Sequence, residues 1–145
     1  MPKPPFPHML PREVTLWQRF LLRHEQEWER FAYDVKVGDG RDPGPEFPEE
    51  IRRMALEITK FRIDAVGFRL GEIGIFEVKV SAGLSAVGQL RAYRRLYDEQ
   101  FRPTQMITTH LVTTDTTPDL IRVYRMEGIT TYVLPEDGTE EIIRP

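Results

Sequence analysis

Two β-rich segments, residues 61–68 and 73–80, are separated by only four residues, and this spacing constrains the fold more than any other feature of the sequence. A connection this short predicts a β-hairpin. A helical pattern follows from residue 84 to about 99, and residues 106–113 are rich in β-branched side chains, which predicts a further strand. A hairpin followed by strands that are joined through helices implies a mixed β-sheet with helices on its faces.

The remaining segments extend this α/β pattern along the chain. Thr15 and Gln18 fit a capping box at the start of a helix whose apolar face continues to about residue 31. The predicted order of elements is α-β-α-β-β-α-β-α-β. We expect a proline-rich extended arm at residues 1–14, a single domain at 15–135 and a polar C-terminal tail at 136–145. The other predicted elements are a strand at 33–37, a loop at 38–48, a helix at 49–58, a helix from Thr117 to about Glu127 and a strand at 129–134.

Composition excludes several classes of protein. The 145 residues include no cysteine, which excludes disulfides, thiolate zinc sites and cysteine catalysis. No apolar run approaches the ~20 residues that span a bilayer, and no secretory signal is visible, so we expect a cytoplasmic protein, or one in the host cytoplasm or virion if it is phage-encoded. A net charge of −3 argues against coating nucleic acid by bulk charge, although residues 50–102 hold ten basic against seven acidic side chains. The three histidines, His8, His24 and His110, are too widely spaced to form a metal-binding pattern.

Charged side chains interrupt both strands of the predicted hairpin. Glu77 and Lys79 follow Ile73 and Ile75 along one face of the strand, and Asp64 lies on the paired strand. Two carboxylates and an ammonium group would meet near the middle of the sheet, where burying unpaired charge is unfavourable. A Mg²⁺ ion bound by the carboxylates would remove that penalty, polarise a phosphoryl oxygen and activate a water. The alternative is an ordinary solvated pair of Glu77 and Lys79 at a strand edge.

The pattern Asp64…Glu77-Val78-Lys79, followed by Gln89-x-x-x-Tyr93, resembles the motifs of the PD-(D/E)xK nuclease superfamily, in particular its RecB-like members. The resemblance covers roughly residues 49–113. It implies a restriction-endonuclease-like mixed β-sheet flanked by helices, with a core of α-β-β-β-α-β type. The sequence departs from the family pattern at Ile63, where members usually have a proline before the first aspartate.

The same resemblance implies roles for individual residues. Asp64, Glu77 and the Val78 carbonyl would bind Mg²⁺, for which Mn²⁺ can substitute. Asp64, Glu77, Lys79 and Gln89 would form the catalytic set. Many members also use a glutamate on the first core helix, and the sequence leaves that residue open. The candidates are Glu57, if the helix at 49–58 is that element, and Glu25, Glu27 or Glu29, if the first helix of the chain is.

Contacts to DNA are expected from basic and aromatic side chains near these motifs. Arginines on the motif helix could bind phosphates, which set affinity without reading sequence, or they could form a solvated face. The spacing of Tyr93 also suits packing into the core. The residues expected to contact DNA are Arg62, Arg91, Tyr93, Arg94 and Arg95.

These features predict a Mg²⁺-dependent DNA endonuclease that hydrolyses phosphodiesters with a metal-activated water. A chain of this length leaves little room for a sequence-reading module, so we expect structure-selective or nonspecific cleavage. The expected partner is DNA, a homodimer would supply two sites for the two strands of a duplex, and no membrane is expected. The alternative is a nuclease-fold phage or mobile-element protein that serves in assembly, with a viral or mobile-element partner, or binds DNA ends, with little or no catalytic activity. An RNA-directed nuclease also stays open.

Overall fold

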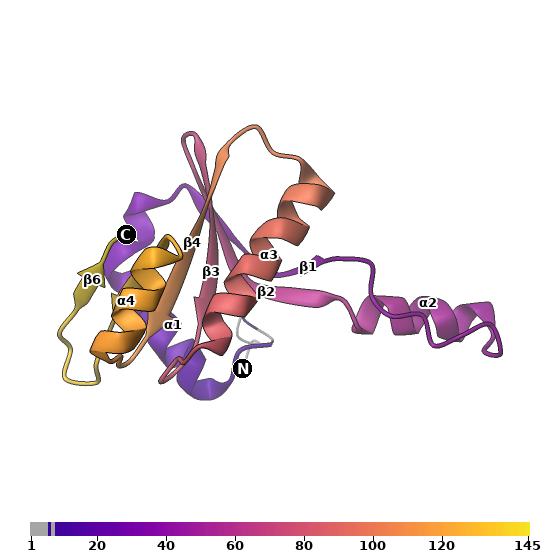
Figure 1. Cartoon of the computed structure of the whole chain (residues 1–145), viewed down its shortest axis with the longest axis horizontal. Coiled ribbons are helices and arrows are strands. Elements are labelled where there is room, and N and C mark those ends of the chain that lie inside the picture. Colours follow the sequence, from indigo (N-terminus) through magenta and orange to yellow (C-terminus); the bar gives the residue numbers. More distant parts are fainter. Residues whose placement is uncertain (1–5, 7) are drawn as a thin grey trace.

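A computed structural model describes residue 6 and residues 8–145 of the chain as an α/β fold built on one mixed sheet (Figure 1). The helices are α1 (Pro11–His24), the short 3-10 helix η1 (Glu25–Glu27), α2 (Glu49–Ile58), α3 (Ser85–Phe101) and α4 (Pro118–Met126). The strands are β1 (Arg30–Val37), β2 (Phe61–Arg69), β3 (Glu72–Val78), β4 (Met106–Thr113), β5 (Ile129–Val133) and β6 (Glu141–Ile143). No helix in the described part of the chain is long and apolar enough to cross a membrane.

The six strands lie in the sheet in the same order as in the sequence. The β1, β2 and β3 strands form an antiparallel meander, β3, β4 and β5 run parallel to one another, and β6 returns antiparallel to β5. The predicted hairpin is confirmed, with Arg69 paired to Glu72 across a two-residue turn. Two parallel neighbours require crossover connections, and α3 and α4 provide them. The mixed sheet with helices on its faces is therefore as predicted.

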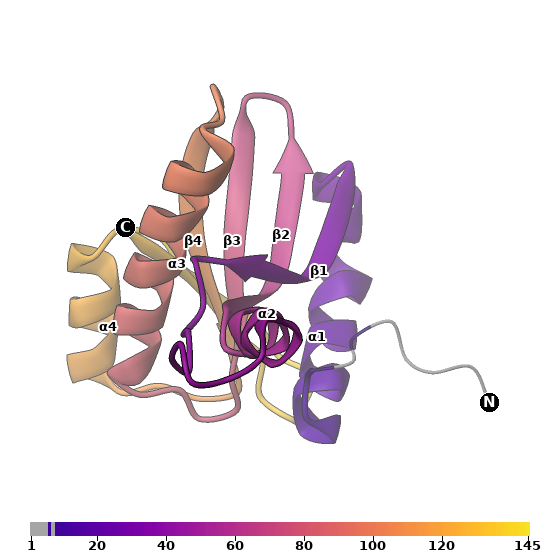
Figure 2. The ribbon, with the colours of Figure 1, turned by 90° about the vertical axis from the view of Figure 1, so that its right-hand side faces the viewer.

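Helices cover both faces of the sheet (Figure 2). The alternation in β3 divides the core, because Ile73 and Ile75 pack with α3 on one face while Phe76 and Val78 pack with α1 on the other. On the α1 face Trp28 lies so close to the sheet that a side chain at Gly74 would place its Cβ 2.6 Å from the indole. A glycine is needed at that position for the indole to fit.

The β1 strand changes face at Asp34. This residue has φ = 54°, in the left-handed region, and it is skipped in the pairing of β1 with β2. Before it, Tyr33 packs with the α1-side core, whereas Val35 beyond it packs with the α3-side core. A residue that has a left-handed backbone conformation and no partner on the neighbouring strand changes the direction of the side chains that follow it, as a β-bulge does. Asp64 is the β2 residue that faces this irregular point.

A projecting arm, residues 38–60, connects β1 to β2 and carries α2. The arm extends away from the sheet (Figure 1), and within α2, all of which is described, no residue is buried. The loop before α2 lies against one side of that helix, where the Arg41 N–H donates to Thr59 Oγ1 at 2.5 Å and Arg52 Nε donates to Asp42 Oδ1 at 3.0 Å. The helix predicted at 49–58 is confirmed, but it stands outside the layered body.

Three predicted boundaries are wrong at the ends of the chain. The α1 helix begins at Pro11 rather than Thr15, because proline suits the first helical position and the Glu13 carboxylate accepts the Leu10 N–H at 3.0 Å. It also ends at His24, well before residue 31, and β1 begins at Arg30. Beyond β5, residues 141–143 form β6 instead of a loose tail. Residues 1–5 and 7 of the predicted extended arm lie outside the described residues, whereas Phe6 is buried against Tyr33.

Candidate active site

Asp64 and Glu77 lie together inside the protein, on neighbouring strands and beside the irregular point of β1. Their exposed fractions are only 8% and 6%. The Val78 N–H donates to Asp64 Oδ2 at 2.8 Å, which ties β3 to the Asp64 carboxylate. Glu77 Oε2, in contrast, is buried and has no hydrogen-bond partner within residues 6 and 8–145. An unpartnered buried carboxylate oxygen is uncommon in a native structure and indicates a site for a ligand or a proton.

The surroundings of Glu77 favour its neutral form. Burial, together with the neighbouring Asp64 carboxylate, raises the pKa of Glu77 to about 9. Lys79 opposes this rise in pKa, and Glu13 adds to it. The three acidic side chains and the lysine are therefore close enough to influence one another. A divalent cation at this place would favour the ionised carboxylates, because it would supply the positive charge that the protein lacks there.

Lys79, Gln89 and Tyr93 surround the carboxylate pair. Lys79 follows the end of β3, and its Nζ donates to Ser85 Oγ, in the first turn of α3, at 3.0 Å. One turn further along α3, Gln89 Oε1 is buried without a hydrogen-bond partner. Burial, and then the charges of Glu77 and Asp64, raise the pKa of Tyr93 to about 12. The structure thus brings the residues of both sequence motifs to one place, and Tyr93 also belongs to the core, as its spacing predicted.

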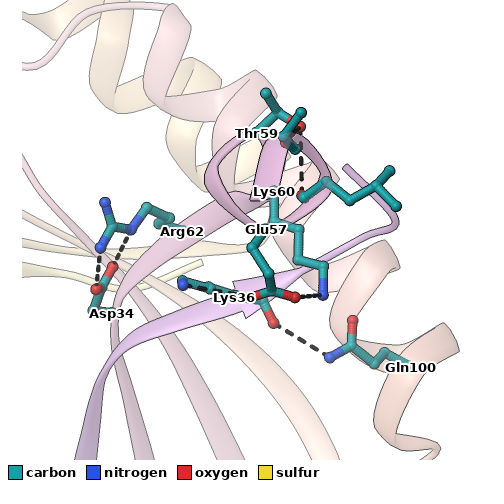
Figure 3. A network of polar contacts seen from close by, with 9 residues as sticks. Asp34, Lys36, Glu57, Thr59, Lys60, Arg62 and Gln100 are labelled. Carbon is teal, nitrogen blue, oxygen red and sulfur yellow. Dashed lines mark hydrogen bonds and ion pairs between the residues drawn. The ribbon is translucent and has the colours of Figure 1, made fainter. Parts of the chain in front are cut away.

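His8 closes one side of this cluster. Its Nε2–H donates to Asp64 Oδ1 at 2.8 Å, and its Nδ1 lies 3.4 Å from Asp34 Oδ1. Asp34 in turn accepts two hydrogen bonds from the guanidinium of Arg62, which is one of the residues expected to contact DNA (Figure 3). Neither His8 nor Asp34 was identified from the sequence. His8 is 56 residues away from Asp64, and no local pattern joins them.

The glutamates that were candidates for an additional site residue lie outside the carboxylate pair. Glu57 is exposed on the projecting arm, where it pairs with Lys60 at 2.6 Å and with Lys36 at 3.6 Å (Figure 3). Glu25 and Glu27 lie in η1 after α1, and Glu29 follows it. Instead, the glutamate that acts on Glu77 is Glu13, in the first turn of α1. The sequence signal for it was Pro11 at the first helical position with Glu13 two residues later.

The remaining arginines of α3 lie away from the carboxylates. At 100° per residue, Arg91 and Arg95 point to the side of the helix opposite Tyr93. Together with Arg94 they line a hollow of about 400 Å³ between α3 and the β4–β5 part of the sheet. Arg91 lies 3.6 Å from Glu127, and Arg95 pairs with Glu99 at 2.6 Å. Their predicted DNA contacts would therefore belong to a different surface from the one around Asp64.

No set of three or more His, Asp or Glu side chains converges as preformed metal ligands within residues 6 and 8–145. Two neighbouring carboxylates, one of them with an unpartnered oxygen, are nevertheless the oxygen donors that Mg²⁺ prefers. Val78 follows Glu77 at the end of β3, so its backbone lies at the same place. Comparisons with models of known families, with curated proteins and with solved structures gave no match.

Proposed function

We propose that this protein is a Mg²⁺-dependent DNA nuclease whose active site is built on Asp64, Glu77 and Lys79. The observation that carries the proposal is the buried carboxylate pair, in which one oxygen of Glu77 has no hydrogen-bond partner among the residues that the structure describes. A protein that needed only a stable core would be better served by apolar residues at these positions, because buried carboxylates seldom add stability. A cation provides the reason to keep them.

The arrangement of the elements supports the resemblance to the PD-(D/E)xK superfamily. Without the arm, the chain runs through α1, the β1–β2–β3 meander, α3 and β4, which is an α-β-β-β-α-β order. In this correspondence α1 is the first core helix, and Glu13 takes the place of the glutamate expected there. The helix α2 is then an insertion between the first two strands of the core. A restriction-endonuclease-like core is therefore part of the proposal.

The residues around the two carboxylates are suited to Mg²⁺, and each of them would have a different role. Asp64, Glu77 and the Val78 carbonyl would hold Mg²⁺, which when bound polarises the phosphodiester and lowers the pKa of a water. Lys79 would orient that water or stabilise the charge that develops on the phosphorus-bound oxygens. Gln89, which has a buried acceptor oxygen without a partner, would position the substrate from α3. Arg62, exposed beside the site, would contact the DNA backbone.

Nicking of supercoiled plasmid DNA with Mg²⁺, and with Mn²⁺ as a substitute, tests the proposal. We expect the wild-type protein to nick and Asp64→Asn and Lys79→Ala to lose activity by about 100-fold or more. Glu57→Gln is the matched control, because it removes a carboxylate on the arm, and it should nick like the wild type. Glu13→Gln should lower activity if Glu13 belongs to the site. An inert wild-type protein with both metals, or full activity of Lys79→Ala, would rule the nuclease out.

A second candidate is a nuclease-fold protein that assembles with a viral or mobile-element partner or binds DNA ends without cleaving. One observation favours it: both Asp64 oxygens already have partners inside the protein, the His8 ring and the Val78 N–H. If this candidate is right, the wild type nicks with neither metal, and Asp64→Asn retains its affinity for DNA ends or for the protein partner. Measuring both properties on the same preparations separates the two candidates.

A further inference from the structure

The projecting arm carries large apolar side chains on the surface of α2, which we call the α2 stripe: Ile51, Met54 and Ile58. Their exposed fractions range from 45% to 76%. The intervals between them are three and four residues, which is the repeat that keeps one face of a helix turned toward a partner helix.

The described part of the chain leaves this stripe uncovered. The loop that lies against α2 occupies another side of the helix, since a side chain at Gly40 would place its Cβ 2.0 Å from the Leu56 carbonyl oxygen. The base of the arm is held by polar contacts instead, with Gln100 accepting from the Gly38 N–H at 3.1 Å and donating to the Lys36 carbonyl at 3.2 Å (Figure 3). Because the arm points away from the sheet (Figure 1), another molecule can reach the stripe.

The sequence of α2 is self-complementary about a point between Met54 and Ala55. Ile51 and Ile58 are three and four residues from Met54. Turning the helix end for end about that point therefore exchanges the two isoleucines and brings the Met54 side chains of the two copies beside each other. In a dimer with a two-fold axis the same patch of both copies forms the contact, so the patch must be complementary to itself.

The charges beside the stripe would also be complementary in an antiparallel pair of α2 helices. Glu49 and Glu50 stand at the start of α2, and Lys60 follows its end. An antiparallel second copy would bring these glutamates near Lys60 of the other chain, whose ammonium group also pairs with Glu57 of its own chain at 2.6 Å. Arg53 and Glu57, on either side of Met54, would be exchanged in the same way. A parallel pair would instead set like charges against each other.

From the apolar stripe and its mirrored charges, we infer that α2 is a homodimerisation helix that pairs antiparallel with α2 of a second copy, about a two-fold axis near Met54. The inference rests on the arm and does not depend on the proposed nuclease activity. A contact limited to one ten-residue helix per copy is at the small end of specific interfaces. The dimer is therefore reversible, with a Kd on the order of micromolar.

Sedimentation velocity of the full chain between about 1 and about 200 µM tests the dimer. The wild type should shift from monomer to dimer across this range, and Met54→Glu or Ile58→Glu should raise the Kd by about tenfold or more. Both side chains are exposed, so circular dichroism should show an unchanged fold. The matched control is Leu70→Glu, which alters a still more exposed leucine in the β2–β3 turn and should dimerise like the wild type.

Cysteine trapping tests the orientation, because the chain has no cysteine of its own. Under mild oxidation Met54→Cys should form a covalent dimer, since the two-fold axis brings the two thiols together, whereas Leu70→Cys should stay monomeric. A wild type that is monomeric up to the highest concentration would overturn the inference. So would a dimer that survives Met54→Glu, equal cross-linking of the two cysteine variants, or a stripe needed only for binding DNA.

Discussion

The body of the molecule and its arm distribute apolar and charged side chains in opposite ways. In the body, Asp64 and Glu77 are buried at the meeting of two strands. In the arm, Met54 and Ile58 are more than half exposed. Each arrangement is unfavourable for an isolated chain, one because it desolvates charge and the other because it leaves apolar surface in water. We propose a different partner for each region, a cation for the body and a second copy of the chain for the arm.

We expect the largest effect on stability from a substitution in the core of the body. Phe76 is fully buried on the α1 face, where its ring contacts Trp17, Phe20 and Trp28. We expect Phe76→Ala to lower the free energy of unfolding by about 3–5 kcal/mol, because it leaves a cavity that a packed face cannot fill. Urea denaturation followed by tryptophan fluorescence measures this. A loss below about 1 kcal/mol would mean that the body is packed as loosely as the arm.

A substitution that removes the buried charge from the candidate site should lower activity and raise stability. Glu77→Gln keeps the size of the side chain but removes its ability to ionise, so we expect plasmid nicking to fall by about 100-fold or more. The same substitution should raise the melting temperature at pH 8, because the wild type there must keep a carboxyl group buried. Thermal denaturation in EDTA measures the change in stability, and nicking in Mg²⁺ with the same samples measures the change in activity. Lower stability together with lower activity would instead identify Glu77 as a structural residue.

The pH dependence of stability also tests whether Glu77 is buried as a neutral carboxyl group. The pKa of Glu77 is raised from its ordinary value of 4.5 to about 9 by burial and by Asp64. Between these values the folded protein holds a proton that the unfolded chain has released. The free energy of unfolding should therefore fall as pH rises from about 4.5 to about 9, by up to about 1.4 kcal/mol per pH unit. Chemical denaturation at several pH values in EDTA measures the slope, and in Glu77→Gln this contribution should be absent.

The smallest effect is expected on the arm. Ile58 is 76% exposed, so Ile58→Glu should change the free energy of unfolding of the monomer by no more than about 0.5 kcal/mol. Urea denaturation at low protein concentration gives the monomer value. A loss comparable to that of Phe76→Ala would show that α2 packs onto its own body in solution, which would remove the contrast between the two regions.

The parts of the structure that were predictable depend on local chemistry. The alternation of Ile75 and Glu77 with Phe76 assigned the two faces of β3, because successive side chains in a strand point to opposite sides. The helix predicted from Thr117 is present as α4, and the Thr117 hydroxyl accepts the Leu120 N–H at 3.3 Å, as a threonine before a helix-starting proline is expected to do. Both features are decided within a few neighbouring residues.

The parts that were missed depend on contacts between distant segments. Thr15 looked like a helix cap, but its hydroxyl donates to the Pro11 carbonyl from inside α1, because the helix had already begun. Only the fold brings the ring of His8 to Asp64, and only the left-handed backbone of Asp34 re-aims β1 toward that place. The motif residues were identifiable from their spacing, whereas the residues that complete the surroundings were not.

The arm enters and leaves the sheet at adjacent points, since Val37 and Phe61 are paired neighbours on β1 and β2. A tight turn could join these two residues without altering the register of any strand. The length or sequence of the arm can therefore change at little risk to the sheet beneath it. A chain built in this way can gain or lose a binding surface by changing one connection between two strands.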